Sequence, residues 1–276
     1  MQHKMDTLTQ KARAIRRNII EMAAKGGGPA HPAPALSCAD IINVLYNNVM
    51  SIRPEDPKWE DRDRFILSKG HACPALYAVL TERGYFPRDW FYSLRKVGGQ
   101  LQGHPDMKKT PGIDMTSGSL GHGLSAGLGM AIALKQRRSK ARVYVILGDG
   151  EIQEGMVWEA AMSAPKLGAD NLVAIIDYNH LQSGGVTDSI MPVEPLSDKW
   201  KAFNWNVLEA NAHNTEELIN KFEIAKMSSG RPSVIIAHSV KGKGISYMEN
   251  NNDWHQKMPS EREYIEACAE LAKEDS

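Results

Sequence analysis

Residues 143–155 read VYVILGDGEIQEG, and this stretch decides the fold. Its apolar start, 143–147, has the composition of a strand buried in a parallel sheet. Residues 154–166 then carry apolar side chains at helical spacing, and a second apolar run occupies 172–176. Strand, turn, helix and strand form a βαβ unit. The sequence therefore predicts an α/β fold: a doubly wound, mainly parallel sheet with helices on both faces.

Two oxygen-bearing side chains follow the ends of these strands. Asp149 lies in a Gly-Asp-Gly turn after the first strand, and Asn179 ends the sequence Asp-Tyr-Asn after the second. Both are expected at the same carboxyl edge of the sheet. A bare Gly-Asp-Gly is more often an ordinary turn than a metal site. The spacing to Asn179, with Glu154 and Glu159 in the helix between them, instead favours a hard cation (Mg²⁺ or Ca²⁺) that holds a diphosphate.

The composition excludes several classes of protein. The 276 residues suffice for one large α/β domain or two small ones. With 33 basic and 33 acidic residues, no net charge draws the chain to nucleic acid or to an anionic membrane. No apolar run approaches the roughly 20 residues of a membrane span, and the N-terminus lacks a signal-peptide core. Three cysteines are few and odd in number, which is typical of a reduced, cytoplasmic protein.

The rest of the chain predicts further helices and strands. An amphipathic helix over 8–25 should end at Gly-Gly-Gly-Pro, and the proline-rich segment 30–36 should be neither helix nor strand. Ser37 should then cap a helix that runs to residue 48, and Thr215 one that runs to residue 227. Further strands are expected at 64–67, 206–210 and 233–237, and further helices at 71–83, 126–134, 196–203 and 260–273.

Several loop residues have both a functional and a structural interpretation. His31 alone is more often a surface residue than a catalyst. His71 either meets an anion at a helix N-terminus or caps that helix. Lys241, in Lys-Gly-Lys-Gly, either reaches a phosphate or lies in a solvated basic loop. The glycines of 118–129 permit close approach of a ligand or simply tight packing.

Taken in order, these motifs resemble the thiamine diphosphate domain of transketolases. The resemblance runs from about Lys11 to Pro259 and rests on one collinear set: Ala30-His31-Pro32, Ser68-Lys69-Gly70-His71-Ala72, Gly103-His104-Pro105, Gly118-Ser119-Leu120-Gly121, Gly148-Asp149-Gly150 with Asn179, Lys241-Gly242-Lys243-Gly244 and Trp254-His255. It implies that residues 1–276 form a single diphosphate-binding domain.

The resemblance also implies a role for each matching residue. The implied metal ligands are Asp149, Asn179 and the carbonyl of Leu181. The implied cofactor contacts are His71, Gly118, Ser119, Leu120, Asp149, Gly150, Lys241 and His255. Glu154 would meet its twin across a dimer interface, and Glu159 would join the same buried acidic network. The implied catalytic histidines are His31, His71, His104 and His255. Histidine suits proton transfer to sugar hydroxyls because its unperturbed pKa lies near neutral pH.

Some residues depart from the family pattern, and the length departs more. Ala30 stands where the family has glycine, Pro34 lies near a common serine, and His122 replaces a common glutamine. The pyrimidine-binding and C-terminal domains of a complete transketolase have no counterpart here. We therefore expect the N-terminal subunit of a split transketolase in an α2β2 assembly with a separate C-terminal subunit. It would transfer a two-carbon ketol unit between sugars or sugar phosphates.

Two other functions remain open at this point. One is a subunit of another thiamine diphosphate enzyme, of the 2-oxoacid dehydrogenase or deoxyxylulose-phosphate synthase type. The other is a cofactor-binding or regulatory partner that has lost catalysis. The three histidines His31, His104 and His255 favour ketol transfer, because decarboxylases need fewer partners for sugar hydroxyls. The sequence does not identify the ketose.

Overall fold

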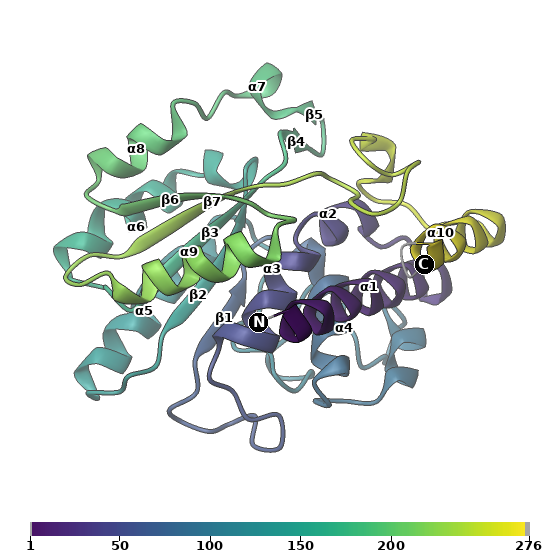
Figure 1. The fold of residues 1–276 in the computed structure, drawn as a ribbon, viewed down its shortest axis with the longest axis horizontal. Coiled ribbons are helices and arrows are strands. Elements are labelled where there is room, and N and C mark those ends of the chain that lie inside the picture. Colours follow the sequence, from purple (N-terminus) through teal and green to yellow (C-terminus); the bar gives the residue numbers. More distant parts are fainter. Residues whose placement is uncertain (1, 274–276) are drawn as a thin grey trace.

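The fold is built on a five-stranded parallel sheet, described over residues 2–273 in a computed structural model (Figure 1). The strand order is β1-β2-β3-β7-β6, and every neighbouring pair is parallel. These strands are β1 (Arg64–Leu67), β2 (Val143–Gly148), β3 (Leu172–Tyr178), β6 (Asn206–Asn211) and β7 (Ser233–His238). A small antiparallel pair, β4 (Leu181–Gln182) and β5 (Gly185–Val186), lies apart from the sheet. The prediction of an α/β fold with a mainly parallel sheet is confirmed.

Helices connect the strands and cover the sheet. The α-helices are α1 (Gln2–Lys25), α2 (Pro32–Ser37), α3 (Ala39–Val44), α4 (Cys73–Glu82), α5 (His122–Gln136), α6 (Gly155–Lys166), α7 (Thr187–Ile190), α8 (Leu196–Ala202), α9 (Thr215–Met227) and α10 (Glu261–Lys273). The shorter turns are η1 (Leu45–Val49), η2 (Gly70–Ala72), η3 (Arg88–Ser93), η4 (Glu151–Gln153) and η5 (Asn252–Trp254). Parallel strands require such crossover connections.

The two faces of the sheet bury two separate hydrophobic cores. Along β2, Tyr144 and Ile146 pack with residues of α1, α3, α4 and α9. The alternate residues, Val143 and Val145, pack with α5, α6 and α8 on the opposite face. Successive side chains of a strand point to opposite faces, so a strand buried on both sides must be apolar throughout. The unbroken apolar run at 143–147 therefore correctly predicted that helices cover both faces of the sheet.

The structure differs from the predictions in two places between residues 30 and 48. The proline-rich segment forms helix α2, because Pro32 occupies its first turn, where a missing N–H costs nothing. The helix predicted from Ser37 to residue 48 is broken at Cys38, and α3 begins afterwards. The Ser37 hydroxyl donates to the Pro34 carbonyl and to Asp177 and does not cap a helix.

Two further predictions also need correction. Asn214, not Thr215, caps α9, because its side-chain oxygen accepts from the N–H of Glu217 at 3.1 Å. Residues 180–195, where the sequence predicts neither helix nor strand, contain β4, β5 and α7.

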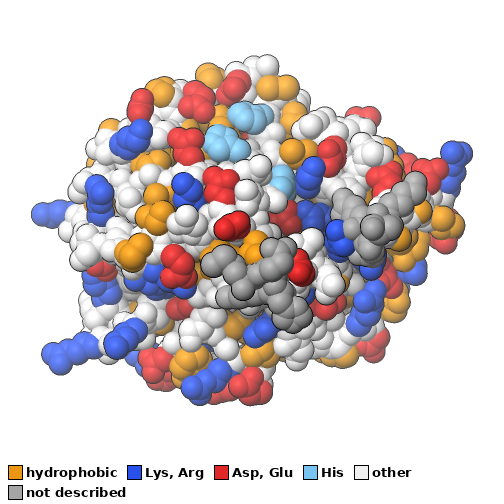
Figure 2. Space-filling view, viewed as in Figure 1, with side chains coloured by type: hydrophobic (Ala, Val, Ile, Leu, Met, Phe, Trp, Pro, Cys, Tyr) orange, Lys and Arg blue, Asp and Glu red, His pale blue; other side chains and the backbone are white. Residues whose placement is uncertain are grey.

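The face of the molecule in Figure 2 carries both signs of charge without a large area of either. Figure 2 shows basic and acidic side chains interspersed over one face, in keeping with the zero formal net charge. Within residues 2–273, no helix combines the length and apolar character that crossing a bilayer requires.

Candidate active site

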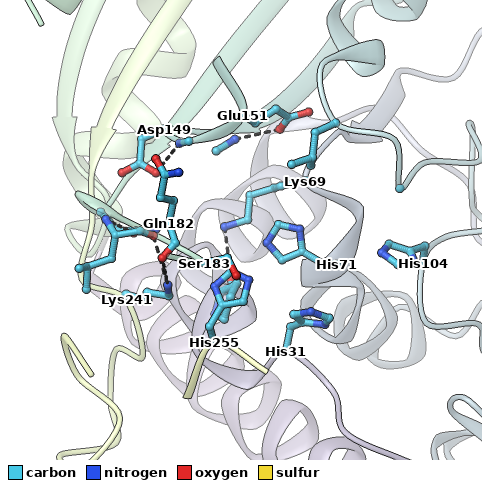
Figure 3. Close-up of a pocket in the computed structure, with 17 residues that line it drawn as sticks. His31, Lys69, His71, His104, Asp149, Glu151, Gln182, Ser183, Lys241 and His255 are labelled. Atoms are coloured by element: carbon cyan, nitrogen blue, oxygen red, sulfur yellow. Dashed lines mark hydrogen bonds between the residues drawn. The ribbon is translucent and has the colours of Figure 1, made fainter. Parts of the chain in front are cut away.

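A cavity of about 330 Å³ opens where β1, β2 and β3 end (Figure 3). Open α/β sheets place ligands at this edge, and the volume suits a small molecule. The predicted site residues that line the cavity are His31, His71, His104, Gly118, Leu120, Asp149, Gly150, Asn179, Leu181, Lys241 and His255. The fold thus brings together residues from near both ends of the chain.

Asp149 contributes an unpaired carboxylate oxygen to the floor of this cavity. Its Oδ1 accepts from the N–H of Gly150 at 2.7 Å. Its Oδ2 is buried and has no hydrogen-bond partner among the described residues. Burial and the nearby negative charge of Asp177 raise the pKa of Asp149. A buried carboxylate oxygen without a partner is costly, and a cation would relieve that cost.

The other two predicted metal ligands lie on the neighbouring strand end. The Asn179 Oδ1 accepts from the N–H of Leu181 at 3.0 Å, which folds this segment back on itself. The Leu181 carbonyl accepts from Nζ of Lys241 at 3.2 Å. One carboxylate, one amide and one carbonyl make a set of hard oxygen donors. In the described part of the chain, no group of three or more His, Cys, Asp or Glu side chains would hold a metal.

Lys241 is a buried cation beside these oxygens. It is 1% exposed, and its Nζ also donates to Oδ1 of Asn252 at 2.6 Å. No carboxylate pairs with it within residues 2–273. Burial and repulsion from Lys69 lower the pKa of Lys241 to about 8. An ammonium group held in a cavity without a counter-ion suits an anionic ligand such as a diphosphate.

A second buried lysine has a full counter-charge. Lys69 and Asp177 form an ion pair below the cavity, and the hydroxyls of Ser37 and Ser239 also donate to this carboxylate. Burial alone would raise the pKa of Asp177, but the Lys69 ammonium and these hydrogen bonds hold it below its usual value. The pair joins the ends of β1 and β3 and supports the floor of the site.

Glu151 fixes the turn that carries Asp149. Its carboxylate accepts from the Ser68 hydroxyl, from the N–H of Gly121 at 2.9 Å and from the N–H of Gly148 at 3.0 Å. One side chain therefore connects the end of β1, the start of α5 and the end of β2. Gly121 caps α5 with φ of 83°, a left-handed conformation that favours glycine.

Three of the predicted histidines form a triangle in the wall of the cavity. The ring centroids of His31 and His71 are 5.2 Å apart, those of His31 and His255 are 5.5 Å apart, and those of His71 and His255 are 5.4 Å apart. Figure 3 shows them turned toward the same space. Nδ1 of His31 and Nδ1 of His255 are buried without hydrogen-bond partners in residues 2–273. All three residues line the cavity, where their rings would meet a bound ligand.

The environment of these rings shifts their titration away from the unperturbed range near neutral pH. Burial, with repulsion from Arg95, lowers the pKa of His31 to about 4. Burial, with repulsion from Lys241, lowers the pKa of His255 to about 3. Burial holds the pKa of His71 well below its ordinary value. All three imidazoles are therefore neutral at neutral pH, and each keeps a lone pair that accepts a proton.

His104 stands next to the glycine motif. Gly118 adopts φ of 144°, and a Cβ at this position would lie 3.2 Å from the His104 ring. Glycine thus lets the backbone lie flat against the imidazole. Leu120 lines the cavity. Ser119 is exposed and does not line it.

The two predicted interface carboxylates lie outside the cavity. Glu154 and Glu159 are both exposed in this chain. Glu154 is the N-cap residue of α6 and packs against Gly121, where an added Cβ would meet it at 2.7 Å. Their predicted places in a dimer interface and its buried acidic network therefore stay predictions.

Several residues that line the cavity were not predicted to have a functional role. They are Lys69, Gly148, Glu151, Gln182 and Ser183. Glu151 had a signal, because it directly follows the Gly-Asp-Gly turn. Lys69 precedes the Gly-His pair, but its partner Asp177 lies more than 100 residues away. That pairing follows from the strand order and not from any local pattern.

The departures from the family pattern lie at different distances from the site. Pro34 lines the cavity, and its carbonyl accepts from Nζ of Lys69 at 3.0 Å. Ala30 accepts from the N–H of Lys257 at 3.1 Å in an antiparallel bridge that joins the segments bearing His31 and His255. His122 is exposed at the start of α5.

Comparison with known proteins gives consistent matches. A family model described as the transketolase thiamine diphosphate binding domain matches residues 5–270. The chain is 43% identical over 274 residues to the 6-deoxy-6-sulfo-D-fructose transketolase subunit SqwG of Clostridium sp. (strain MSTE9), and the match covers 99% of each chain. It is 40% identical over 270 residues to one subunit of the apulose-4-phosphate transketolase of Phocaeicola vulgatus, covering 98% of this chain and 95% of that protein.

Solved structures agree with these relatives. The transketolase from Leishmania mexicana superposes with a TM-score of 0.90 at 30% identity, covering 96% of this chain and 41% of that one. The chain thus spans about two fifths of the length of that solved transketolase. The matches confirm the resemblance inferred from the motifs and do not favour a 2-oxoacid dehydrogenase or a deoxyxylulose-phosphate synthase. The chain therefore belongs to the transketolase family, whose thiamine diphosphate-binding domain it carries over residues 5–270.

Proposed function

We propose that this chain is the N-terminal subunit of a split, thiamine diphosphate- and Mg²⁺-dependent transketolase. It transfers a two-carbon ketol unit from a ketose to an aldose, or between their phosphates, together with a separate C-terminal subunit. The whole chain, 1–276, acts as one diphosphate-binding domain, in a cytoplasmic α2β2 assembly. The observation that carries the proposal is the unpaired Oδ2 of Asp149, beside the oxygens of Asn179 and Leu181 and below a wall of neutral histidines.

The residues present fit both cofactors. Asp149, Asn179 and the Leu181 carbonyl would hold Mg²⁺, since all three offer hard oxygen ligands. Lys241 and the backbone at Gly150 would hold the diphosphate. Gly150 has no room for a side chain, because its Cβ would lie 2.8 Å from Cβ of Gln182. When bound, thiamine diphosphate supplies the carbanion chemistry that breaking a carbon–carbon bond requires.

The protein's own task is to bind the sugar and move its hydroxyl protons. His31 and His255 are best placed for proton transfer, because both line the cavity, with ring centroids 5.5 Å apart. His71 supports both rings, with centroids 5.2 Å and 5.4 Å from those of His31 and His255. His104 extends the wall along the cavity and would bind a further hydroxyl. Neutral imidazoles suit this task, because each accepts a proton at one nitrogen and donates at the other.

The ketose is best found with a panel of substrates. The relatives from Clostridium and Phocaeicola vulgatus are named for 6-deoxy-6-sulfo-D-fructose and apulose 4-phosphate. We propose that this chain takes a ketose of the same broad class, an anionic or branched sugar, or a pentulose or hexulose phosphate. The panel should contain all four kinds.

The test is reconstitution with a separate C-terminal transketolase subunit. Each protein alone, and then the mixture, would be assayed with Mg²⁺ and thiamine diphosphate for ketol transfer to an aldose acceptor. We expect activity from the mixture only. Full activity of the lone chain would refute the split assembly. Carbon dioxide release from pyruvate would refute ketol transfer, and absence of cofactor binding to the mixture in calorimetry would favour a regulatory role.

A further inference from the structure

Arg95 lies beside His31 and His71 and has an uncommon backbone conformation. It follows η3 and adopts φ of 61°, the left-handed region that side chains other than glycine seldom enter. Its N–H donates to the Leu101 carbonyl at 3.0 Å, which holds this conformation. Backbone strain of this kind costs of order 1–3 kcal/mol and persists only where the surroundings enforce it. The left-handed φ and this hydrogen bond thus fix the backbone from which the Arg95 side chain extends.

The guanidinium group of Arg95 packs against Gly103, the residue before His104. A Cβ on Gly103 would lie 3.3 Å from Cζ of Arg95 and 3.4 Å from its Nε and Nη1. Gly103 directly precedes His104, and Arg95 also lines a small cavity together with His31 and His71. The side chain therefore lies against the back of the histidine wall, on the side away from the main cavity, which it does not line.

This cation has no counter-ion among residues 2–273. Its Nη1 is buried without a hydrogen-bond partner, and no carboxylate within ion-pair distance is described for it. The buried cations Arg16 and Lys69 pair with Asp40 and Asp177, whereas Lys241 has no paired carboxylate in the described chain either. A guanidinium stays charged at any pH a protein tolerates, so the charge of the half-buried Arg95 acts on its neighbours without a paired carboxylate.

We propose that Arg95 is a positioning residue of the sugar site, whose charge adds to burial in disfavouring protonation of His31 and His104, so that each presents a lone pair to a sugar hydroxyl. The inference rests on the proposed function for its role in catalysis. The effect of the Arg95 charge on the pKa values of His31 and His104 can be measured without any enzymatic activity.

The charges that face the two histidines support this assignment. Burial lowers the pKa of His104, and Arg95 is the charged group that adds to the effect. For His31, burial acts first and Arg95 is the foremost of the charged neighbours, ahead of His104, Lys241 and Lys69. The rings of His71 and His255 also face His31, and both are kept neutral by burial. Removing the Arg95 charge must therefore raise both pKa values.

The test compares three variants in the assembled enzyme. Arg95→Met removes the charge and keeps an unbranched side chain, and Arg95→Lys keeps the charge. Lys96→Met removes a charge from the exposed neighbouring residue and is the matched control. Hydrogen–deuterium exchange at C2 of histidine, resolved by peptide mass spectrometry, gives the pKa of each ring without any need for activity. The pH profile of kcat/KM is measured in parallel.

In Arg95→Met we expect the pKa of His31 and of His104 to rise by about 0.5–1 unit, the size of one partly screened charge nearby. The acid limb of kcat/KM should move to higher pH by the same amount, because a protonated imidazole offers no lone pair. Arg95→Lys and Lys96→Met should leave both readouts in place. The inference would be overturned if hydrogen–deuterium exchange gave the same pKa values for His31 and His104 in Arg95→Met as in the wild type.

Two further results keep the test decisive. If Arg95→Met fails to fold, Arg95→Gln takes its place, because glutamine also removes the charge but keeps hydrogen-bond donors, and unchanged pKa values of His31 and His104 in that variant would overturn the inference. If the assembled enzyme proves inactive on every sugar, the exchange data still test the effect of the charge. That failure would count against the proposed function and not against the electrostatic role of Arg95.

Discussion

Replacing Asp149 with asparagine should make the metal-free protein more stable and abolish its response to Mg²⁺ and thiamine diphosphate. In the wild type, Oδ2 of Asp149 is a buried carboxylate oxygen without a partner in the described chain. Asparagine keeps the oxygen that accepts from the N–H of Gly150 at 2.7 Å and removes the charge. A cost of folding is thereby lowered, while the strongest ligand for the cation is lost.

The magnitude follows from the free energy of burying an unsatisfied group, which is about 1–3 kcal/mol. The new amide nitrogen also lacks a partner, so we expect a net gain of about 1 kcal/mol, or roughly 2–4 °C in Tm for a chain of this size. Ligand at about 100 times Kd should stabilise the wild type by about 2.7 kcal/mol. The variant should gain almost nothing, so the order of stability reverses when the ligands are added.

The assay is thermal unfolding with chelator and then with saturating Mg²⁺ and thiamine diphosphate. Asp177→Asn is the matched control, because the same substitution one strand away breaks the buried pair with Lys69. That control should lose about 3–5 kcal/mol. The two substitutions should therefore have opposite signs without ligand.

The pH dependence supplies a second check. Burial and Asp177 raise the pKa of Asp149 in the folded state above its unfolded value. The cost of the charge is thus present at neutral pH and disappears as the pH falls through that raised pKa. The wild type and Asp149→Asn should converge in acid. A variant that is less stable without metal, or one that ligand still stabilises as much as the wild type, would refute the reasoning.

Three further predictions concern the cavity. His31→Ala should keep cofactor binding in calorimetry and lose about 10²–10⁴-fold in turnover, because a proton-transfer group is removed; unaltered turnover in the assembled enzyme would dismiss that role. Gly150→Ala should weaken diphosphate binding, since its Cβ would lie 2.8 Å from Cβ of Gln182. Gly155→Ala, whose Cβ meets nothing within 4 Å, is its control, and equal affinities would show that the turn has room. The pKa of Lys241 is lowered to about 8 by burial, so its charge is present below that pH and lost above it. The affinity for diphosphate should therefore fall as the pH rises through that value. In Lys241→Met the affinity should not change with pH over this range. The same pH dependence in the variant and the wild type would show that Lys241 does not cause it.

The sequence predicted the sheet because the strands buried on both faces, such as 143–147, are continuous apolar runs. It predicted Asp149 and Asn179 at one edge because a βαβ unit has only one common arrangement. It did not predict helix α2, because proline in a first helical turn looks the same as proline in a loop. The helix break at Cys38 had no local signal either.

The electrostatics of the site were the least predictable feature. The Lys69–Asp177 pair joins residues from distant strands, and no local pattern announces it. The neutral state of His31 depends on burial and on the field of Arg95, which exist only after folding. Composition and spacing therefore identified which residues gather at the cavity, whereas their protonation had to come from the structure.

The antiparallel bridge between Ala30 and Lys257 has a consequence for biosynthesis. It joins the loops bearing His31 and His255 across more than 200 residues of sequence, so it forms only after Lys257 has left the ribosome. The sheet and its diphosphate edge are encoded upstream of that point and can be in place earlier. A nascent chain should therefore form the strand ends that carry Asp149 and Asn179 before it can join the loops that carry His31 and His255.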